Sequence, residues 1–190
     1  MNKKSFLTVL LVPTCILLIP AAAMVFSAEG WEWDTTDFII AWVFIGGAVI
    51  AYQLVASRAR HHTYRIATGI AVMTGLILLW INGAVGLIGS EDNPANLMYG
   101  GVLVIGLIGA AIARLRPLGM SLALASTAVA QFLVPVIALI IWRPEFSSGV
   151  VSVFILNFCF VLLFAASALL FRHAGFASGG MVVRRSGAIQ

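Results

Sequence analysis

The sequence predicts an all-α fold, a polytopic bundle of membrane-spanning helices. Apolar residues make up 62% of the 190 residues and charged residues only 9%, against about a quarter in soluble domains. The apolar residues also gather in runs close to the roughly 20 residues that a helix needs to cross a bilayer. A β-barrel is excluded, because its strands would alternate polar and apolar residues and these runs do not. We expect a single membrane domain over 1–190 with six spans, at 5–27, 38–57, 66–89, 97–113, 118–142 and 150–171.

The first run, 5–27, fits either a retained helix or a signal peptide. Lys3 and Lys4 precede it, and the alanines at 21–23 offer the small residues of a cleavage site. The run nevertheless continues through 24–26, beyond the roughly 7 to 15 apolar residues of a signal core. We therefore predict a retained first span, whereas cleavage would leave five spans.

The charges around the runs predict how the helices cross the membrane. Ten of the eleven Lys and Arg residues fall on one side once the runs are threaded through a bilayer, and all seven carboxylates fall on the other. Because basic residues in short loops favour the cytoplasmic side, both termini are predicted to be cytoplasmic. Residues 172–190 are predicted to form a short, flexible, basic cytoplasmic tail. The basic set is Lys3, Lys4, Arg58, Arg60, Arg65, Arg114, Arg116, Arg172, Arg184 and Arg185, the acidic set is Glu29, Glu32, Asp34, Asp37, Glu91, Asp92 and Glu145, and Arg143 is the exception.

Spans 3 and 4 carry small residues of the kind that pack helices in lipid. Small side chains let helix backbones approach closely where no hydrophobic effect drives association. These two faces therefore predict contact with a protein partner or with a second copy of the chain. The small residues are Gly83, Gly86 and Gly89 at the end of span 3, and Gly101, Gly106, Gly109 and Ala113 along span 4.

Asn93 and Pro94 mark the approach to span 4. Asn is a favoured N-cap residue, and Pro is favoured at the first helical position because its missing N–H is not needed there. We expect this pair to have a structural, helix-capping role.

Three amide side chains, a tryptophan and two carboxylates form the candidate site. Asn82 and Asn157 each lie about 10 Å inside the outer end of a predicted span, at roughly 1.5 Å per residue, so they could meet. Gln131, near the middle of span 5, adds a third buried amide. Such amides either bond helices to one another or line a binding site. The candidate outer vestibule or polar path comprises Trp80, Asn82, Glu91, Asp92, Gln131 and Asn157.

The sequence offers no recognised constellation for catalysis or for a cofactor. None of the Lys, Arg, Asp and Glu residues needs to lie deep in a span, and the three His residues also fall outside. That placement disfavours proton relays, ion coupling and intramembrane haem. Cys15 and Cys159 lie inside spans, where a thiol behaves as a small hydrophobe. We expect no catalytic residue, no cofactor and no metal site, although a surface enzyme using Glu91 and Asp92 on lipid head groups stays open.

Three strings carry a wider resemblance: residues 18–24 leading to Asp37 and Phe38, residues 82–99, and residues 113–120. Through them, most of the chain resembles a bacterial family of small multi-span membrane proteins without assigned function. The resemblance implies a bacterial cytoplasmic (inner) membrane and the helical layout given above. It implies no activity, cofactor or catalytic residue.

Two functional hypotheses follow, from different classes. The small-residue faces favour a non-enzymatic accessory subunit or interaction protein of a membrane assembly. The alternative is a passive channel or binding protein for a small neutral solute or lipid, which would use the buried amides. The lipid bilayer is the expected partner in both hypotheses, and no nucleic acid is expected.

Overall fold

The protein is a set of long α-helices, as the sequence predicts. The computed structural model describes residues 3–26, 33–59, 61–90, 92–143, 145 and 147–186, with side chains as far as Ala177. Within these residues, six helices are long and apolar enough to cross a membrane, and no strand occurs. The all-α, multi-span fold class is therefore confirmed. The orientation of the termini stays a prediction.

The chain divides into two compact units, Met1–Ser57 and Arg58–Gln190, here called the N-terminal and the C-terminal unit. Each is described by itself. The expectation of one membrane domain over 1–190 stays a prediction.

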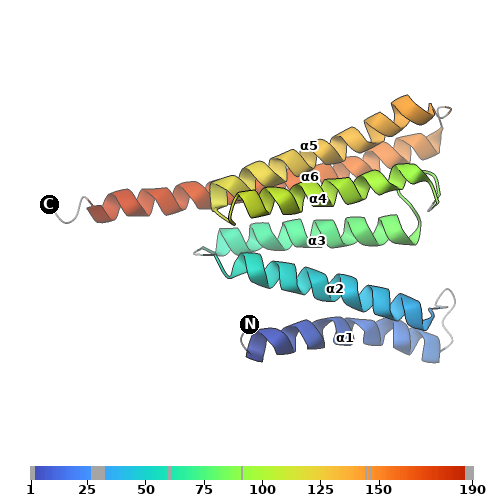
Figure 1. Cartoon of the computed structure of the whole chain (residues 1–190), viewed down its shortest axis with the longest axis horizontal. Coiled ribbons are helices and arrows are strands. Elements are labelled where there is room, and N and C mark those ends of the chain that lie inside the picture. Colours follow the sequence, from blue (N-terminus) through green and yellow to red (C-terminus); the bar gives the residue numbers. More distant parts are fainter. Residues whose placement is uncertain are drawn as a thin grey trace. The chain divides into compact units, whose positions relative to one another are not determined.

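The N-terminal unit is a pair of antiparallel helices, α1 (Lys3–Val25) and α2 (Thr35–Ala56) (Figure 1). A capping box starts α2: the Asp34 side chain accepts from the Asp37 N–H at 2.9 Å, and the Asp37 side chain accepts from the Asp34 N–H at 2.9 Å. Polar side chains join the two helices at one end, where α1 begins, and at the middle of α1. Ser5 donates to the Gln53 side chain, and Trp42 Nε1 donates to Thr14 Oγ1 at 3.3 Å.

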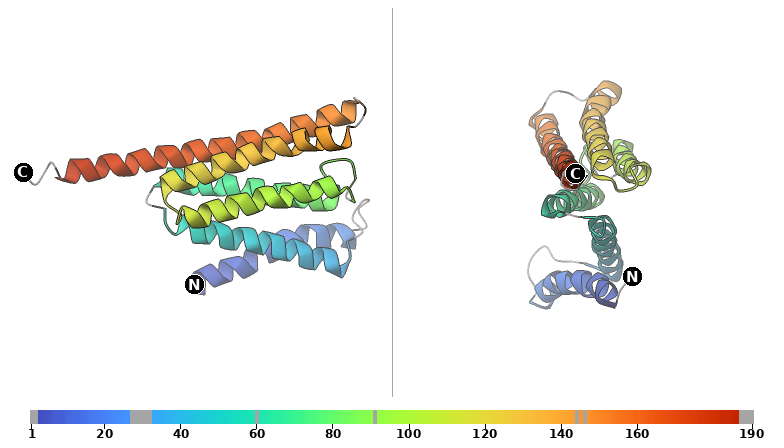
Figure 2. Two further views of the ribbon diagram at one scale, coloured as in Figure 1. Left: turned by 45° about the horizontal axis from the view of Figure 1, so that its top comes forward. Right: turned by 90° about the vertical axis from the view of Figure 1, so that its left-hand side faces the viewer.

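The C-terminal unit contains α3 (His62–Ala84), the short 3-10 helix η1 (Pro94–Asn96), α4 (Leu97–Ile112), α5 (Pro117–Trp142) and α6 (Ser148–Ser186). Helix α6 packs along both α3 and α5, and α5 packs along α4 (Figure 2). We call the end at which α3 and α5 begin the proximal end, and the end at which they finish the distal end. The core is built on α6. Phe171 on this helix is fully buried, and its ring meets the Tyr64 ring edge-to-face, with 4.8 Å between the ring centroids.

Two of the predicted small residues of span 4 serve packing inside this unit. A Cβ added at Gly109 would lie 2.7 Å from Ala123 Cβ, and one added at Gly106 would lie 3.1 Å from Thr127 Oγ1. Glycine at these positions therefore lets α4 approach α5 closely. The faces predicted for an outside partner are in part occupied by the chain's own α5.

The two largest differences between the predicted and the observed helix bounds are at the ends of spans 3 and 6. Span 3 was expected to reach residue 89, but α3 ends at Ala84 because the apolar residues after it fold into the connection to α4. Span 6 was expected to end at 171, but α6 continues to Ser186 and extends past the other helices of its unit (Figure 1). Helix thus continues over 172–186, where no proline interrupts the hydrogen bonds. The flexible, basic cytoplasmic tail over 172–190 stays a prediction. Residues 187–190 lie outside the described part.

Candidate binding site between helices α5 and α6

A buried polar cluster joins α4, α5 and α6 in the distal half of the C-terminal unit. Tyr99 on α4, Gln131 on α5 and Asn157 on α6 are each 1% exposed or less. The Tyr99 hydroxyl donates to Asn157 Oδ1 at 2.9 Å, and Gln131 Nε2 donates to the same oxygen at 2.9 Å. One amide oxygen thus ties three helices together. We call Tyr99, Gln131 and Asn157 the buried polar cluster.

The orientation of the Asn157 amide is fixed by its second contact. Asn157 Nδ2 donates to the Val153 carbonyl at 2.8 Å, which turns Oδ1 toward Tyr99 and Gln131. An amide carries two N–H donors, so one donor of Asn157 remains beyond this bond. Gln131 Oε1 is buried and has no hydrogen-bond partner among the described residues. The cluster therefore keeps both a donor and an acceptor in reserve, although an unsatisfied buried group costs about 1–3 kcal/mol.

Two cavities lie beside the cluster, one toward the distal end and one at the level of Asn157. The end cavity, about 370 Å³, lies among Leu87, Pro135, Trp142, Val153 and Phe154. Pro135 and Val153 are one helical turn from Gln131 and Asn157, at about 5.4 Å per turn. The floor of the end cavity thus approaches the buried polar cluster.

The lateral cavity opens on the face where α5 and α6 run together. It measures about 320 Å³ and is lined by Asn157 itself, with exposed apolar side chains around it. Pro135 and Phe154 line both cavities, so the two lie on either side of these residues. Phe132 and Phe158 at the lateral mouth are 49% and 53% exposed.

The lining of both cavities suits a neutral, mainly apolar molecule. None of the described residues that line either cavity is charged, and most are aliphatic or aromatic. Apolar cavities with a few placed polar groups are the usual form of a small-molecule site. Asn157 can supply one hydrogen bond to such a ligand.

The structure separates the predicted site residues into two groups. Gln131 and Asn157 join in the buried polar cluster. The predicted meeting of Asn82 with Asn157 is wrong, because Asn82 Nδ2 donates to the Asn96 carbonyl at 3.2 Å. Equal depth in the membrane does not fix rotation about a helix axis, and Asn82 points toward the connection between α3 and α4.

The rest of the predicted vestibule does not form one site with the cluster. Asp92 is exposed in the connection before α4, and Trp80 is half-buried on α3. Neither lines the end cavity or the lateral cavity. Glu91 lies outside the described residues.

The connection from α3 to α4 is organised by a residue that the sequence did not single out. Asn96 Oδ1 accepts from the Leu87 and Ile88 N–H groups at 3.1 and 2.9 Å. Asn96 Nδ2 donates to the Ser90 carbonyl at 2.7 Å and to the Ile88 carbonyl at 3.3 Å. This side chain thus supplies the backbone partners that the irregular segment lacks.

Asn93 and Pro94 occupy the cap positions that the sequence predicts, although at a 3-10 helix rather than at α4 directly. The Asn93 side chain accepts from the Ala95 N–H at 2.9 Å, and Pro94 is the first residue of η1.

Tyr99 is a second site residue, besides Asn96, that the sequence did not single out. Tyr99 lies in the first turn of α4 among apolar residues, where the sequence reads as an ordinary span. Its role depends on the contact of its hydroxyl with Asn157, which the sequence does not show.

Comparisons with known proteins give no further information on the site. No family model, no curated protein and no solved structure matches the chain. Among the described residues, no three His, Cys, Asp or Glu side chains come together where they could hold a metal ion.

Proposed function

We propose that this protein binds a small neutral molecule or a lipid between α5 and α6, in the half of the membrane near the distal end. The observation that carries the proposal is the double role of Asn157. This residue holds the buried polar cluster together and also lines the lateral cavity. A ligand that dissolves in the membrane and carries one polar atom requires such a site, with apolar walls and one polar group inside.

The chemistry of the cavities narrows the ligand class. The spare N–H of Asn157 would donate to an ester carbonyl, a ketone or a hydroxyl oxygen on the ligand. The aromatic and aliphatic lining would hold its hydrocarbon part, and an ionised ligand would find no opposite charge among the described lining residues. A neutral lipid or small amphiphile fits these conditions. Entry would be sideways from the bilayer through the lateral cavity, past Phe132 and Phe158.

Native mass spectrometry of the full-length protein, released from membranes with its lipids, tests this proposal. We expect a reproducible bound amphiphile on the wild-type protein. Asn157→Leu removes the polar contact and Phe154→Trp fills space shared by both cavities, so each variant is expected to lose most of that adduct. Asn82→Leu is the matched control, because Asn82 contacts the α3–α4 connection and lines neither cavity.

Equal adducts on the wild type and on both site variants would contradict the proposed site. Phe154→Trp keeps the buried polar cluster intact, so it tests the cavities even if Asn157→Leu does not fold. Loss of the adduct in Asn82→Leu alone would move the ligand to the α3–α4 connection.

The second proposal is the accessory subunit, and a separate observation favours it. Cβ atoms added at Gly83, Gly100 and Gly101 would meet nothing within 4 Å, so these small residues remain open on α3 and α4. An interface helix from a partner or from a second copy of the chain would use such faces. A stoichiometric second polypeptide in the same mass spectra, lost in Gly100→Leu, supports this role.

We also propose a bacterial cytoplasmic membrane as the location, with both termini inside. The one-sided distribution of Lys and Arg supports the orientation. The resemblance to a bacterial multi-span family supports the membrane. Cysteine labelling from either side of intact cells, at a position added to each terminus, tests the orientation.

A further inference from the structure

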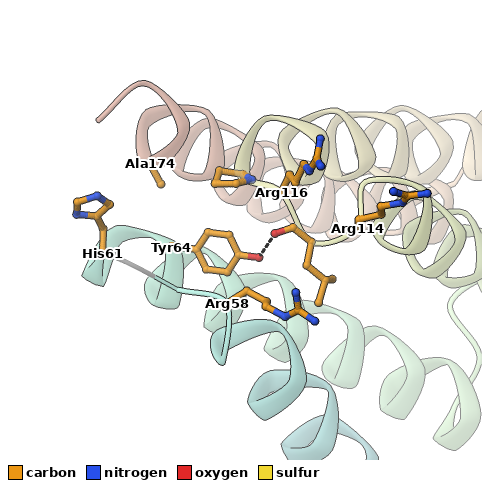
Figure 3. A pocket seen from close by; sticks show the side chains of 8 residues that line it. Arg58, His61, Tyr64, Arg114, Arg116 and Ala174 are labelled. Carbon is orange, nitrogen blue, oxygen red and sulfur yellow. Dashed lines mark hydrogen bonds between the residues drawn. The ribbon is translucent and has the colours of Figure 1, made fainter. Parts of the chain in front are cut away.

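A second, differently charged pocket lies at the proximal end of the C-terminal unit. Its volume is about 420 Å³, and Arg58, Arg114 and Arg116 contribute to its lining together with His61 and Tyr64. Figure 3 shows the three arginines on one side of the Tyr64 ring, with His61 on the other. We call this the basic pocket. It plays no part in the site between α5 and α6.

The arginines of the basic pocket come from two separate connections. Arg58 precedes α3, whereas Arg114 and Arg116 belong to the turn between α4 and α5. All three side chains are exposed, and the described carboxylates of this unit, Asp92 and Glu145, lie in connections at the distal end. Among the described residues of the unit, none at the proximal end therefore offers these arginines a carboxylate partner.

The backbone under the pocket is held in an unusual conformation. Arg114 and Leu115 both have positive φ, 49° and 58°. The left-handed region costs an L-residue about 1–2 kcal/mol, and such strain concentrates at functional sites. The Tyr64 hydroxyl donates to the Leu115 carbonyl at 2.7 Å and thereby supports the turn (Figure 3).

His61 adds an unsatisfied polar atom to the same pocket. Its Nε2 is buried and has no hydrogen-bond partner among the described residues. A buried ring nitrogen without a partner costs free energy unless a ligand or ion completes it. The pocket thus combines guanidinium groups with a free imidazole nitrogen, and both are groups that contact phosphate oxygens.

We propose that the basic pocket binds a phosphate group, supplied by the head group of an anionic phospholipid. Guanidinium groups pair with phosphate through parallel hydrogen bonds, and several arginines can share its oxygens. The pocket lies at the end of membrane-spanning helices, where basic clusters between helices meet lipid head groups. The ligand is anionic, in contrast to the neutral molecule proposed for the site between α5 and α6.

Thermal unfolding of the full-length protein in neutral detergent tests this inference. Titration with phosphatidylglycerol is expected to raise the unfolding midpoint, and phosphatidylcholine at equal concentration is not. The double variant Arg114→Gln with Arg116→Gln should weaken the apparent Kd for phosphatidylglycerol about tenfold or more, since each charge-assisted hydrogen bond contributes strongly. Inorganic phosphate is titrated in parallel to separate a lipid head group from a free anion.

The matched control removes the same charge elsewhere at the proximal end. Arg65 and Arg172 are exposed there but do not line the basic pocket, so Arg65→Gln with Arg172→Gln should leave the Kd within about twofold. Equal weakening in the two double variants would overturn the pocket in favour of general attraction between charges. So would equal stabilisation by phosphatidylcholine.

Two further outcomes also test the proposed phosphate site. Stabilisation by inorganic phosphate alone, lost in the pocket variant, supports the phosphate site but overturns the lipid as its source. Arg58→Gln, which lies outside the α4–α5 turn, repeats the test if the double variant does not fold. An unchanged Kd in Arg58→Gln would then contradict the proposal.

Discussion

The two irregular connections of α4 are built on opposite principles. The α3–α4 connection, residues 85–93, is held by a polar side chain just beyond it: Asn96, the last residue of η1, makes four hydrogen bonds to its backbone. The α4–α5 turn, residues 113–116, has two residues in the left-handed region and one side-chain hydrogen bond, from Tyr64.

The two connections therefore differ in what their side chains do. In the first connection, a polar side chain satisfies the backbone, and the apolar side chains of Leu87 and Ile88 line the end cavity. In the second, backbone–backbone hydrogen bonds and the Tyr64 hydroxyl hold the turn, and the side chains of Arg114 and Arg116 are exposed. Three substitutions test this difference, from the largest expected effect to the smallest.

Asn96→Ala is expected to have the largest effect. It removes four hydrogen bonds and leaves backbone groups of Leu87, Ile88 and Ser90 without partners. The free energy of unfolding should fall by about 3–5 kcal/mol, measured by denaturant titration in detergent. Asn93→Ala removes one capping bond of the same connection and should cost about 1 kcal/mol. Equal losses in the two variants would contradict the central role of Asn96.

Gly86→Ala should cost about 2–3 kcal/mol. Gly86 has a φ of 69°, and a Cβ there would lie 2.6 Å from the Ser90 carbonyl carbon and oxygen. Gly83→Ala is the matched control, since a Cβ at Gly83 meets nothing within 4 Å and alanine favours a helix. Thermal midpoints of the two variants should therefore shift in opposite directions, and a lower midpoint for both would point to a general intolerance of change.

Tyr64→Phe should have the smallest effect, about 1 kcal/mol. It removes the hydrogen bond to the Leu115 carbonyl and keeps the edge-to-face contact with Phe171. Hydrogen exchange in the α4–α5 turn should rise while exchange in the α3–α4 connection stays unchanged. Faster exchange in both connections would show that Tyr64 acts through the whole core.

The sequence predicted the helices well and their ends less well. Hydropathy locates each span because apolar length is what a bilayer selects. It placed residues 85–89 in span 3, although Leu87 is buried in the connection to α4 rather than in a helix. It also ended span 6 at 171, because Arg172 changes the hydropathy without breaking the helix.

The candidate site was predicted in part. Gln131 and Asn157 stand out as amides in apolar surroundings, and the structure joins them. The pairing of Asn82 failed, since depth along a helix says nothing about its rotation. For the basic pocket, the charge distribution predicts only that Arg58, Arg114 and Arg116 lie on one side of the membrane. That they line one pocket depends on the packing of α3 beside the α4–α5 turn, where Tyr64 bonds to Leu115, and the sequence does not show this contact.

Photolabelling in liposomes with a diazirine-bearing neutral lipid is the most direct test of the ligand site between α5 and α6. If the label simply followed surface exposure, α4 should carry more of it than α6. Leu97, Leu107 and Ile112 on α4 are 80%, 68% and 78% exposed, whereas Ile155 on α6 is 62% exposed. A binding site predicts the reverse: excess label on residues 132–139 and 154–161, strongly reduced by Phe154→Trp. Label that follows exposure over α4, α5 and α6, and that is unchanged in Phe154→Trp, would contradict the account.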